Sequence, residues 1–160
     1  CPCGHATDPN KVCKCSSYAV KRYRSKISGP LLDRIDMHVQ VSAISLIELQ
    51  SKRKQESSSD IKKRVMRARK IQEDRCKNSQ YIFWNSNLST DQIKSLCSLP
   101  KEANHLLENA MNQFNLSARS YHRILKVSRT IADLEGSDRI LSNHIAEALH
   151  YRCLDRGQLN

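Results

Sequence analysis

The chain has 160 residues and a formal net charge of +11, with 39% hydrophobic and 27% charged residues. These values are typical of a soluble globular protein with one domain, or with a small domain and an extra segment. No apolar run approaches the ~18 residues of a membrane span, and four Gly and four Pro are too few turn signals for a many-stranded sandwich or barrel. The positive charge favours nucleic acid or nucleotide phosphate as a partner. The alternative is a basic surface with no specific ligand.

Cysteine usage indicates the compartment of the chain. The seven cysteines are an odd number and no secretory signal is visible, which favours reduced thiols in a cytoplasmic chain over a disulfide framework. The chain does not begin with Met, so we expect Cys1 to be an internal position of a longer protein. The absence of a visible leader sequence therefore says little about where the protein is located.

Residues 1–17 are rich in cysteine and contain two Pro and one Gly, a composition that predicts a loop. The four cysteines, in the pattern C-x-C, nine residues, C-x-C, are Cys1, Cys3, Cys13 and Cys15. Four thiolates can hold Zn²⁺ tetrahedrally and brace a loop that has little core, and His5 could replace one of them. The spacing differs from the usual C-x₂-C knuckle, and a reduced or partly oxidised loop without metal is the alternative.

Residues 18–36 begin with a basic stretch and end in the string GPLLDRID at 29–36. A Gly-Pro stop followed by a short apolar turn can hold Arg34 rigidly at a domain edge. From there its guanidinium can reach the γ-phosphate of a nucleotide on a neighbouring subunit and stabilise transition-state charge. The alternative is an ion pair of Arg34 with Asp33 or Asp36.

The segment after this turn carries three weaker signals. Residues 37–41 (MHVQV) alternate apolar and polar side chains, which predicts a half-buried strand. A short helix is expected over 45–50, and the polar tract 51–59 (SKRKQESSS) is typical of a linker. We therefore expect one unit over residues 1–50 and a second over 60–160.

The first predicted helix of the second unit runs from 60 to 77, with Ser59 or Asp60 as its N-cap. Its inner stripe consists of Ile61, Val65, Ala68, Gln72 and Cys76. Cations cover its other faces, and six are candidates for contacts with a nucleic-acid backbone: Lys62, Lys63, Arg64, Arg67, Arg69 and Lys70. Each can replace a counterion on a phosphate. The alternative is a solvated face that Glu73 and Asp74 partly compensate.

Helical signals continue to the end of the chain. The apolar residues 81–84 (YIFW) are expected to tuck a loop onto the core. Four more helices are predicted from their start and stop signals, which are Ser89, Pro100, Ser117 and Ser142 at the starts and Gly136 at one end. The predicted fold is therefore mainly α, with a small helical bundle at 60–160.

Arg119 is predicted to project from the first turn of the helix that Ser117 caps. A helix N-terminus favours anions through its free N–H groups and its dipole, and an added arginine makes a phosphate site there. Arg123, one turn further along, is the second candidate. The alternative is that Arg119 is an exposed arginine on a solvated face.

Three strings together resemble one protein family. They are CPCG at 1–4, RYRSKISGPLLDRID at 22–36 and LSARSYHRILKVSRTIADL at 116–134. The chain is similar over nearly its whole length to magnesium-chelatase-like AAA+ ATPases of the ComM/YifB type. The resemblance implies the C-terminal remnant of an AAA+ α/β core followed by a helical-bundle lid domain. It also implies that Arg34 is an arginine finger acting in trans, and that Arg119, or else Arg123, is a sensor-2 arginine on ATP.

The family's activity sets further expectations. Its members resemble hexameric rings that use ATP and Mg²⁺ to drive branch migration of DNA during natural transformation. This implies DNA and further copies of the chain as partners. The chain holds no G-x-x-x-x-G-K-[ST] loop, which the family places upstream, so we expect no ATP hydrolysis by this polypeptide alone. Three alternatives stay open: a stand-alone nucleic-acid-binding module with a zinc-stapled loop, a protein-interaction adaptor, and a magnesium-chelatase subunit.

Overall fold

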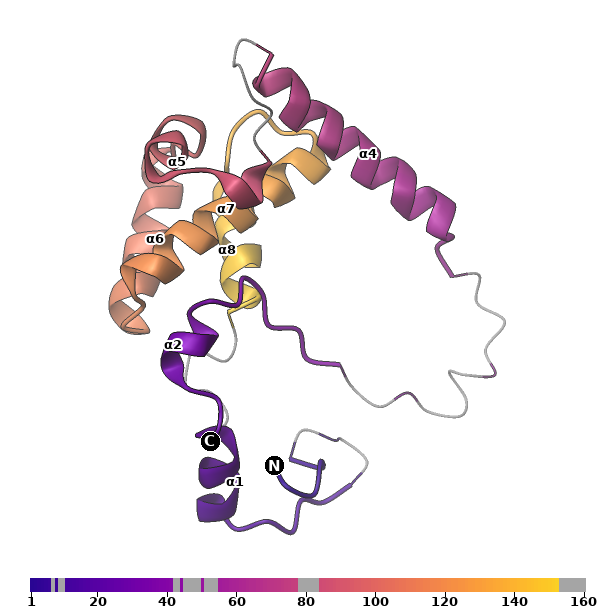
Figure 1. Cartoon of the computed structure of the whole chain (residues 1–160), viewed down its shortest axis with the longest axis vertical. Helices are drawn as coiled ribbons and strands as arrows, with labels where there is room; N and C mark the ends of the chain where they lie inside the picture. The colour runs from indigo at the N-terminus through magenta and orange to yellow at the C-terminus, as the bar shows by residue number, and fades with distance from the viewer. Residues whose placement is uncertain are drawn as a thin grey trace. The chain divides into compact units, whose positions relative to one another are not determined.

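The computed structural model describes residues 1–6, 8, 11–41, 44, 50, 55–77 and 84–152, and every regular element among them is a helix (Figure 1). The chain divides into two compact units. One comprises Cys1–Ile35 and Val39–Gln55, and the other Asp36–His38 and Glu56–Asn160. The prediction of a mainly α fold is confirmed. No helix in the described ranges is both long enough and apolar enough to cross a membrane.

The described residues of the first unit include two short helices with complete bounds. Helix α1 (Ser17–Arg24) begins at Ser16, whose Oγ accepts the backbone N–H of Ala19 at 3.2 Å. Its last turn carries three cations, which suit the negative end of the helix dipole. Helix α2 (Gly29–Leu32) is a single turn with Pro30 near its start, where a missing backbone N–H does no harm.

The expected strand at 37–41 is not formed. Its described residues have no regular structure, and Val39 and Val41 are 66% and 85% exposed. An alternating pattern makes a strand only when a second strand pairs with it, and here the backbone N–H of His38 instead donates to the carbonyl of Tyr151 at 2.7 Å. The helix expected over 45–50 falls outside the described residues except for residue 50 at its end.

The second unit is a helical bundle. Its elements in chain order are α4 (Ser58–Arg75), the 3₁₀ turn η1 (Asn85–Asn87), α5 (Thr90–Leu96), α6 (Lys101–Gln113), α7 (Ala118–Glu135) and α8 (Ser142–His150). Helix α7 packs against α4, α5, α8 and η1, and α6 packs against α8. The apolar faces of α5, α6, α7 and α8 form one core around Leu107, Ile124 and Ile145, each at most 1% exposed.

Most of the predicted helix boundaries are confirmed. Ser89 and Ser117 accept N–H groups of their own first turns, and Gly136 ends α7 in the left-handed conformation with φ of 81°. Pro100 stands at the N-cap of α6, one residue before the predicted position. The predicted cap of α4 was wrong. Ser57, rather than Ser59 or Asp60, caps this helix, because its Oγ accepts the Asp60 N–H at 3.2 Å.

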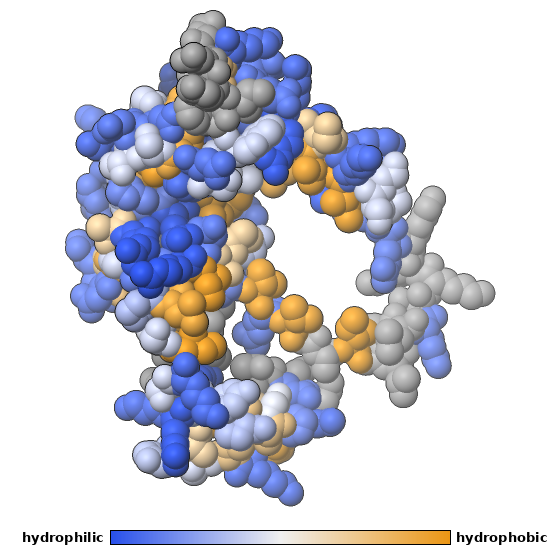
Figure 2. Space-filling model, viewed as in Figure 1, coloured by the Kyte–Doolittle hydropathy of each residue, from blue (hydrophilic) through white to orange (hydrophobic). Residues whose placement is uncertain are grey.

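Helix α4 is only half covered by the bundle. Ala68, Gln72 and Cys76 are buried as predicted, but Ile61 and Val65 are 42% and 43% exposed. The first turns of α4 therefore project beyond its contact with α7, and Figure 2 shows uncovered hydrophobic side chains along this helix. Of the predicted 81–84 anchor, only Trp84 lies among the described residues, and it is half-buried.

A buried polar cluster joins α4, η1 and α7. The carboxylate of Asp133, 1% exposed, accepts the Arg129 Nε–H at 3.1 Å and the Asn85 Nδ2–H at 2.7 Å, and it pairs with Arg75 of α4. Gln72 accepts the backbone N–H of Asn85 at 3.2 Å. Because buried charges are tolerated only when paired and hydrogen-bonded, this cluster fixes how the C-terminal half of α4 sits on α7.

Candidate functional site

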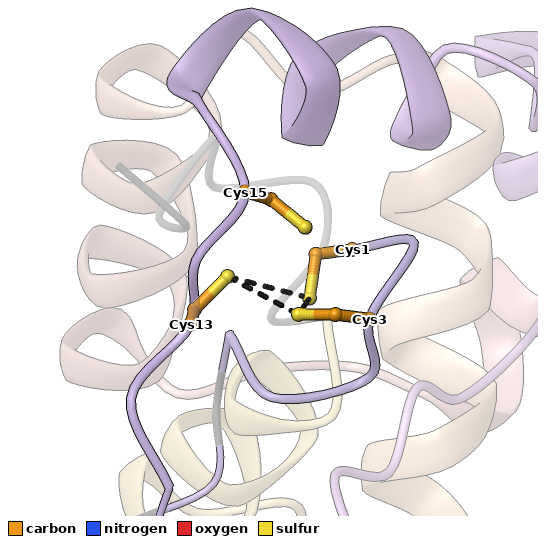
Figure 3. A group of neighbouring side chains, drawn as sticks. All are labelled: Cys1, Cys3, Cys13 and Cys15. Carbon is orange, nitrogen blue, oxygen red and sulfur yellow. Dashed lines mark hydrogen bonds between the residues drawn. The ribbon is translucent and has the colours of Figure 1, made fainter.

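The four N-terminal cysteines converge on one point (Figure 3). Their sulfur atoms all lie within 4.8 Å of one another. The separations are 3.4 Å between Cys1 and Cys3, and 3.6 Å from Cys13 to each of these two. A disulfide needs about 2.05 Å, and all four are free thiols. The structure thus brings together the residues that the sequence proposed as metal ligands. It places His5 outside this group, 3.7 Å from a carboxylate oxygen of Asp8.

The thiols of the chain differ in acidity. A hydrogen bond from the backbone of His5, with further bonds inside the cluster, lowers the pKa of Cys3 from 9.0 to about 6. Burial in the bundle core raises the pKa of Cys97 to about 11. Hydrogen bonding in the cluster therefore favours the thiolate form of Cys3, which is the form that ligates metals, whereas Cys97 behaves as a small buried hydrophobe.

Arg34 lies just after α2, in the first unit. Its side chain is exposed, and one of its terminal nitrogens donates to the carbonyl of Pro30 at 2.9 Å. The backbone N–H of Arg34 also bonds to the Leu31 carbonyl at 3.0 Å. These two bonds hold the guanidinium beside its own turn with its other donors facing outward. The Asp36 carboxylate, one of the alternative partners considered above, pairs with Arg123 instead.

Arg119 is the second residue of α7 and is exposed. Within the described part of the chain it forms no ion pair or hydrogen bond through its side chain. Arg123 is 22% exposed at its side chain and holds Asp36 against the start of α7. The structure therefore separates the two sensor-2 candidates, because Arg119 faces outward while Arg123 is occupied in a structural contact.

The basic face of α4 divides into compensated and uncompensated cations. Lys63 pairs with Asp60 at 3.2 Å, Arg64 with Glu56 at 2.5 Å, and Lys70 with Glu73 and Asp74 at 3.6 and 3.5 Å. The guanidinium of Arg69 lies 4.2 Å from the ring centre of Trp84, a cation–π contact. The contacts of these four residues are typical of a solvated helix face whose charge is partly compensated. Such exposed ion pairs contribute little to stability.

Two of the six candidate cations, Lys62 and Arg67, have neither an acidic partner nor an aromatic contact among the described residues, whereas Arg69 has the aromatic contact alone. Together with Lys63, Lys62 and Arg67 line an open hollow of about 660 Å³, completed by Ser59 and Met66. No acidic side chain lines this hollow in the described part of the chain. Lys62 and Arg67, together with Lys63, whose ammonium group also pairs with Asp60, form a basic surface that can accept a phosphate.

Sequence reasoning missed the contacts that span distant segments. The Arg123–Asp36 pair and the Asp133 cluster join residues 87 and 58 positions apart. Only the spacing of Arg129 and Asp133, four residues apart on the inner face of a helix, offered a signal. These residues hold the bundle together, and all except Arg123 lie outside the predicted ligand sites.

A helical bundle that follows a Gly-Pro-Leu-Leu-Asp-Arg turn is the arrangement expected for the C-terminal part of a magnesium-chelatase-like protein. Residues 55–152 match the family model of the magnesium chelatase, subunit ChlI C-terminal, and residues 1–49 match that of the magnesium chelatase, subunit ChlI. The chain therefore belongs to the magnesium-chelatase-like family.

Individual relatives agree with this assignment. The chain is 38% identical to competence protein ComM of Haemophilus influenzae, and 36% identical to the YifB proteins of Salmonella typhimurium and Escherichia coli. Each match covers 97% of this chain and 29% of the relative. The chain thus spans somewhat less than a third of the length of these relatives.

Proposed function

We propose that this chain acts as the C-terminal part of an ATP-driven, ring-forming AAA+ motor that moves DNA, with branch migration in natural transformation or recombination as its task. The observation that carries the proposal is Arg34, exposed and anchored by its own turn, in a chain of the magnesium-chelatase-like family. Competence protein ComM is among the relatives. A cytoplasmic location, and a ring of six copies, belong to the same proposal.

In this proposal Arg34 serves the nucleotide of the neighbouring subunit. A guanidinium offers five N–H donors in a planar fork, which suits the oxygens of a phosphate. The bond from Arg34 to Pro30 uses one donor and leaves the others available. Positive charge placed where negative charge develops on the γ-phosphate lowers the barrier to phosphoryl transfer.

Arg119 is proposed to contact the nucleotide of its own subunit as the sensor-2 arginine. It is preferred over Arg123 because Arg123 would first have to leave Asp36. The 160 residues contain no phosphate-binding loop, and the only group of three or more potential ligands among the described residues is the four-cysteine cluster. Mg²⁺ requires oxygen ligands, so these residues do not fit it, and ATP and Mg²⁺ would be held by other parts of the motor.

DNA is proposed to contact α4 through the cations that line the hollow. Changing Lys62, Lys63 and Arg67 together to Gln is expected to weaken binding to duplex DNA by about 10- to 100-fold. The slope of log K against log salt should also become less steep by about 2–3, because the variant displaces about three fewer counterions from the DNA. Fluorescence anisotropy at several salt concentrations measures both quantities.

The matched control changes Lys77, Lys94 and Lys101 to Gln, which removes the same charge from exposed positions elsewhere. If both triple variants lose the same affinity, the binding reflects net charge alone and α4 is not the interface. If this chain alone binds nucleic acid tightly and specifically, a stand-alone nucleic-acid-binding module with a zinc-stapled loop becomes the better interpretation of its function.

A mixing experiment tests the motor. In the full-length ring protein, one subunit population carries Arg34→Ala and the other a disabled phosphate loop. Each population alone is expected to be inactive, and the mixture is expected to recover ATP turnover, because an intact loop then meets an intact arginine across a subunit boundary. Arg22→Ala, an exposed cation on α1, replaces Arg34→Ala in the control and should be active without a partner. A mixture that stays inactive argues against action in trans.

A further inference from the structure

The four-cysteine cluster takes no part in the ATPase and DNA-binding roles proposed above. We infer that Cys1, Cys3, Cys13 and Cys15 form a structural zinc site that holds residues 1–16 together and sets the start of helix α1. This inference does not depend on the motor proposal, because it rests on the thiol positions and on the packing of the first unit.

The sulfur separations match those around a single ion. Zn–S bonds of about 2.3 Å in a tetrahedron place neighbouring sulfurs roughly 3.8 Å apart. In the structure the separations are 3.4 Å for Cys1 to Cys3 and 3.6 Å for Cys13 to each of them, and all four sulfurs lie within 4.8 Å. The short C-x-C spacing is therefore no obstacle, because Cys1 and Cys3 already lie at about one tetrahedral edge. An iron–sulfur cluster holds its thiolates around several atoms and needs a wider frame.

The described residues of the first unit provide no hydrophobic packing that would hold this loop. None of the described residues from Cys1 to Ile35 is buried, and Val12 and Tyr18 are 85% and 72% exposed. A segment without a core depends on a covalent or metal staple to keep one conformation. All four thiols are free, so disulfides do not provide that staple here.

The backbone around the cluster supports metal ligation. Gly4 has a φ of 79°, a left-handed conformation that glycine adopts without strain, and its N–H bonds to the Cys1 carbonyl at 3.1 Å. This turn folds the chain back so that the Ala6 N–H donates to Cys1 Sγ at 3.1 Å. Hydrogen bonds from backbone N–H groups to ligand atoms orient metal ligands and stabilise thiolate charge.

The site also has a mechanical consequence for α1. Cys15 immediately precedes Ser16, the N-cap of this helix. A bound ion therefore fixes the residue before the cap and, through it, the direction in which α1 presents Lys21, Arg22 and Arg24. Four protein ligands fill a tetrahedral ion completely and leave no position for water or substrate, so the zinc is structural and takes no part in catalysis.

Metal analysis of the chain, purified under reducing conditions, tests the inference. We expect one zinc per chain by elemental analysis. Exchange for Co²⁺ should give intense thiolate-to-cobalt charge-transfer bands and the visible bands of a tetrahedral ion. Cys3→Ser with Cys13→Ser should abolish both signals. Removing zinc with a chelator should raise amide exchange in residues 11–24 at least 10-fold, without change in helices α6 to α8.

A matched variant separates this effect from misfolding. Cys76→Ser with Cys97→Ser removes two thiols from the second unit, outside the cluster, and should still bind one zinc. Circular dichroism of the bundle confirms that both double variants are folded. The inference is overturned if the unaltered chain binds no zinc, if it binds iron in place of zinc, or if the variant lacking Cys3 and Cys13 keeps a full equivalent.

Discussion

Arg34→Ala in the full-length ring protein is expected to lower kcat for ATP by about 10³-fold or more, with little change in KM. The reason is that the guanidinium meets charge that develops only as the γ-phosphate leaves, so its loss affects the transition state far more than the bound nucleotide. Its attachment to Pro30 at 2.9 Å keeps it placed before the reaction begins. Steady-state ATP turnover of the assembled ring measures kcat and KM separately.

Two further variants sharpen this prediction. Arg34→Lys keeps the charge but loses the planar fork, and it should recover only a small part of the rate. Arg22→Ala removes an exposed cation from the same unit and should turn over ATP normally. A rise in KM with unchanged kcat would contradict the proposal, because it would show that Arg34 binds the ground state only. Normal turnover by Arg34→Ala would make this residue structural.

Asp133→Asn is expected to destabilise the bundle by about 3–5 kcal/mol, the usual effect of removing one partner of a buried ion pair. The substitution keeps the shape of the side chain but leaves Arg75 and Arg129 facing each other without their shared carboxylate. Burial lowers the pKa of Arg129 because it disfavours the charged guanidinium, and the negative charge of Asp133 opposes this effect. Urea unfolding of the chain, followed by circular dichroism, measures the change in free energy of unfolding.

The control for this prediction is Asp91→Asn. Asp91 is 96% exposed and pairs with Lys94 at 3.9 Å, so its replacement should change stability by no more than about 0.5 kcal/mol. A double-mutant cycle with Arg75→Met should show that Arg75 and Asp133 do not act independently. A loss below about 1 kcal/mol for Asp133→Asn would mean that water or neighbouring backbone carbonyls replace the carboxylate.

Local signals predicted most of the helical architecture. Ser89, Ser117 and Gly136 act through hydrogen bonds or backbone conformations confined to a few residues, so their roles follow from the local sequence. The same holds for the apolar faces of α6 and α7, whose periodicity indicates the side that is buried. The α4 cap was misplaced by two or three residues because a run of serines offers several equivalent caps, and the Ser57–Asp60 contact selects one of them.

Predictions that needed knowledge of distant neighbours did less well. The alternating residues 37–41 predict a strand only if a partner strand is present, and the described residues supply none. The inner stripe of α4 is correct in its period, but Ile61 and Val65 stay exposed because the bundle ends before it reaches them. The pairing of Arg123 with Asp36 joins distant segments and was not predicted, while the role of Arg123 as a phosphate ligand stays a prediction.

The sequence by itself determined the family, the helices of the second unit with most of their caps, and the residues eligible for chemistry: four cysteines in two C-x-C pairs, Arg34, Arg119 and the cations of α4. These follow from local spacing and from motif strings, which need no knowledge of the packed chain. Only the tertiary structure decided that the four sulfurs meet within 4.8 Å, that Asp133 gathers two arginines and an asparagine, and which cations lack acidic partners. The physical reason is that metal ligation and buried ion pairs depend on distances between residues far apart in the chain, which chain folding sets and spacing does not encode.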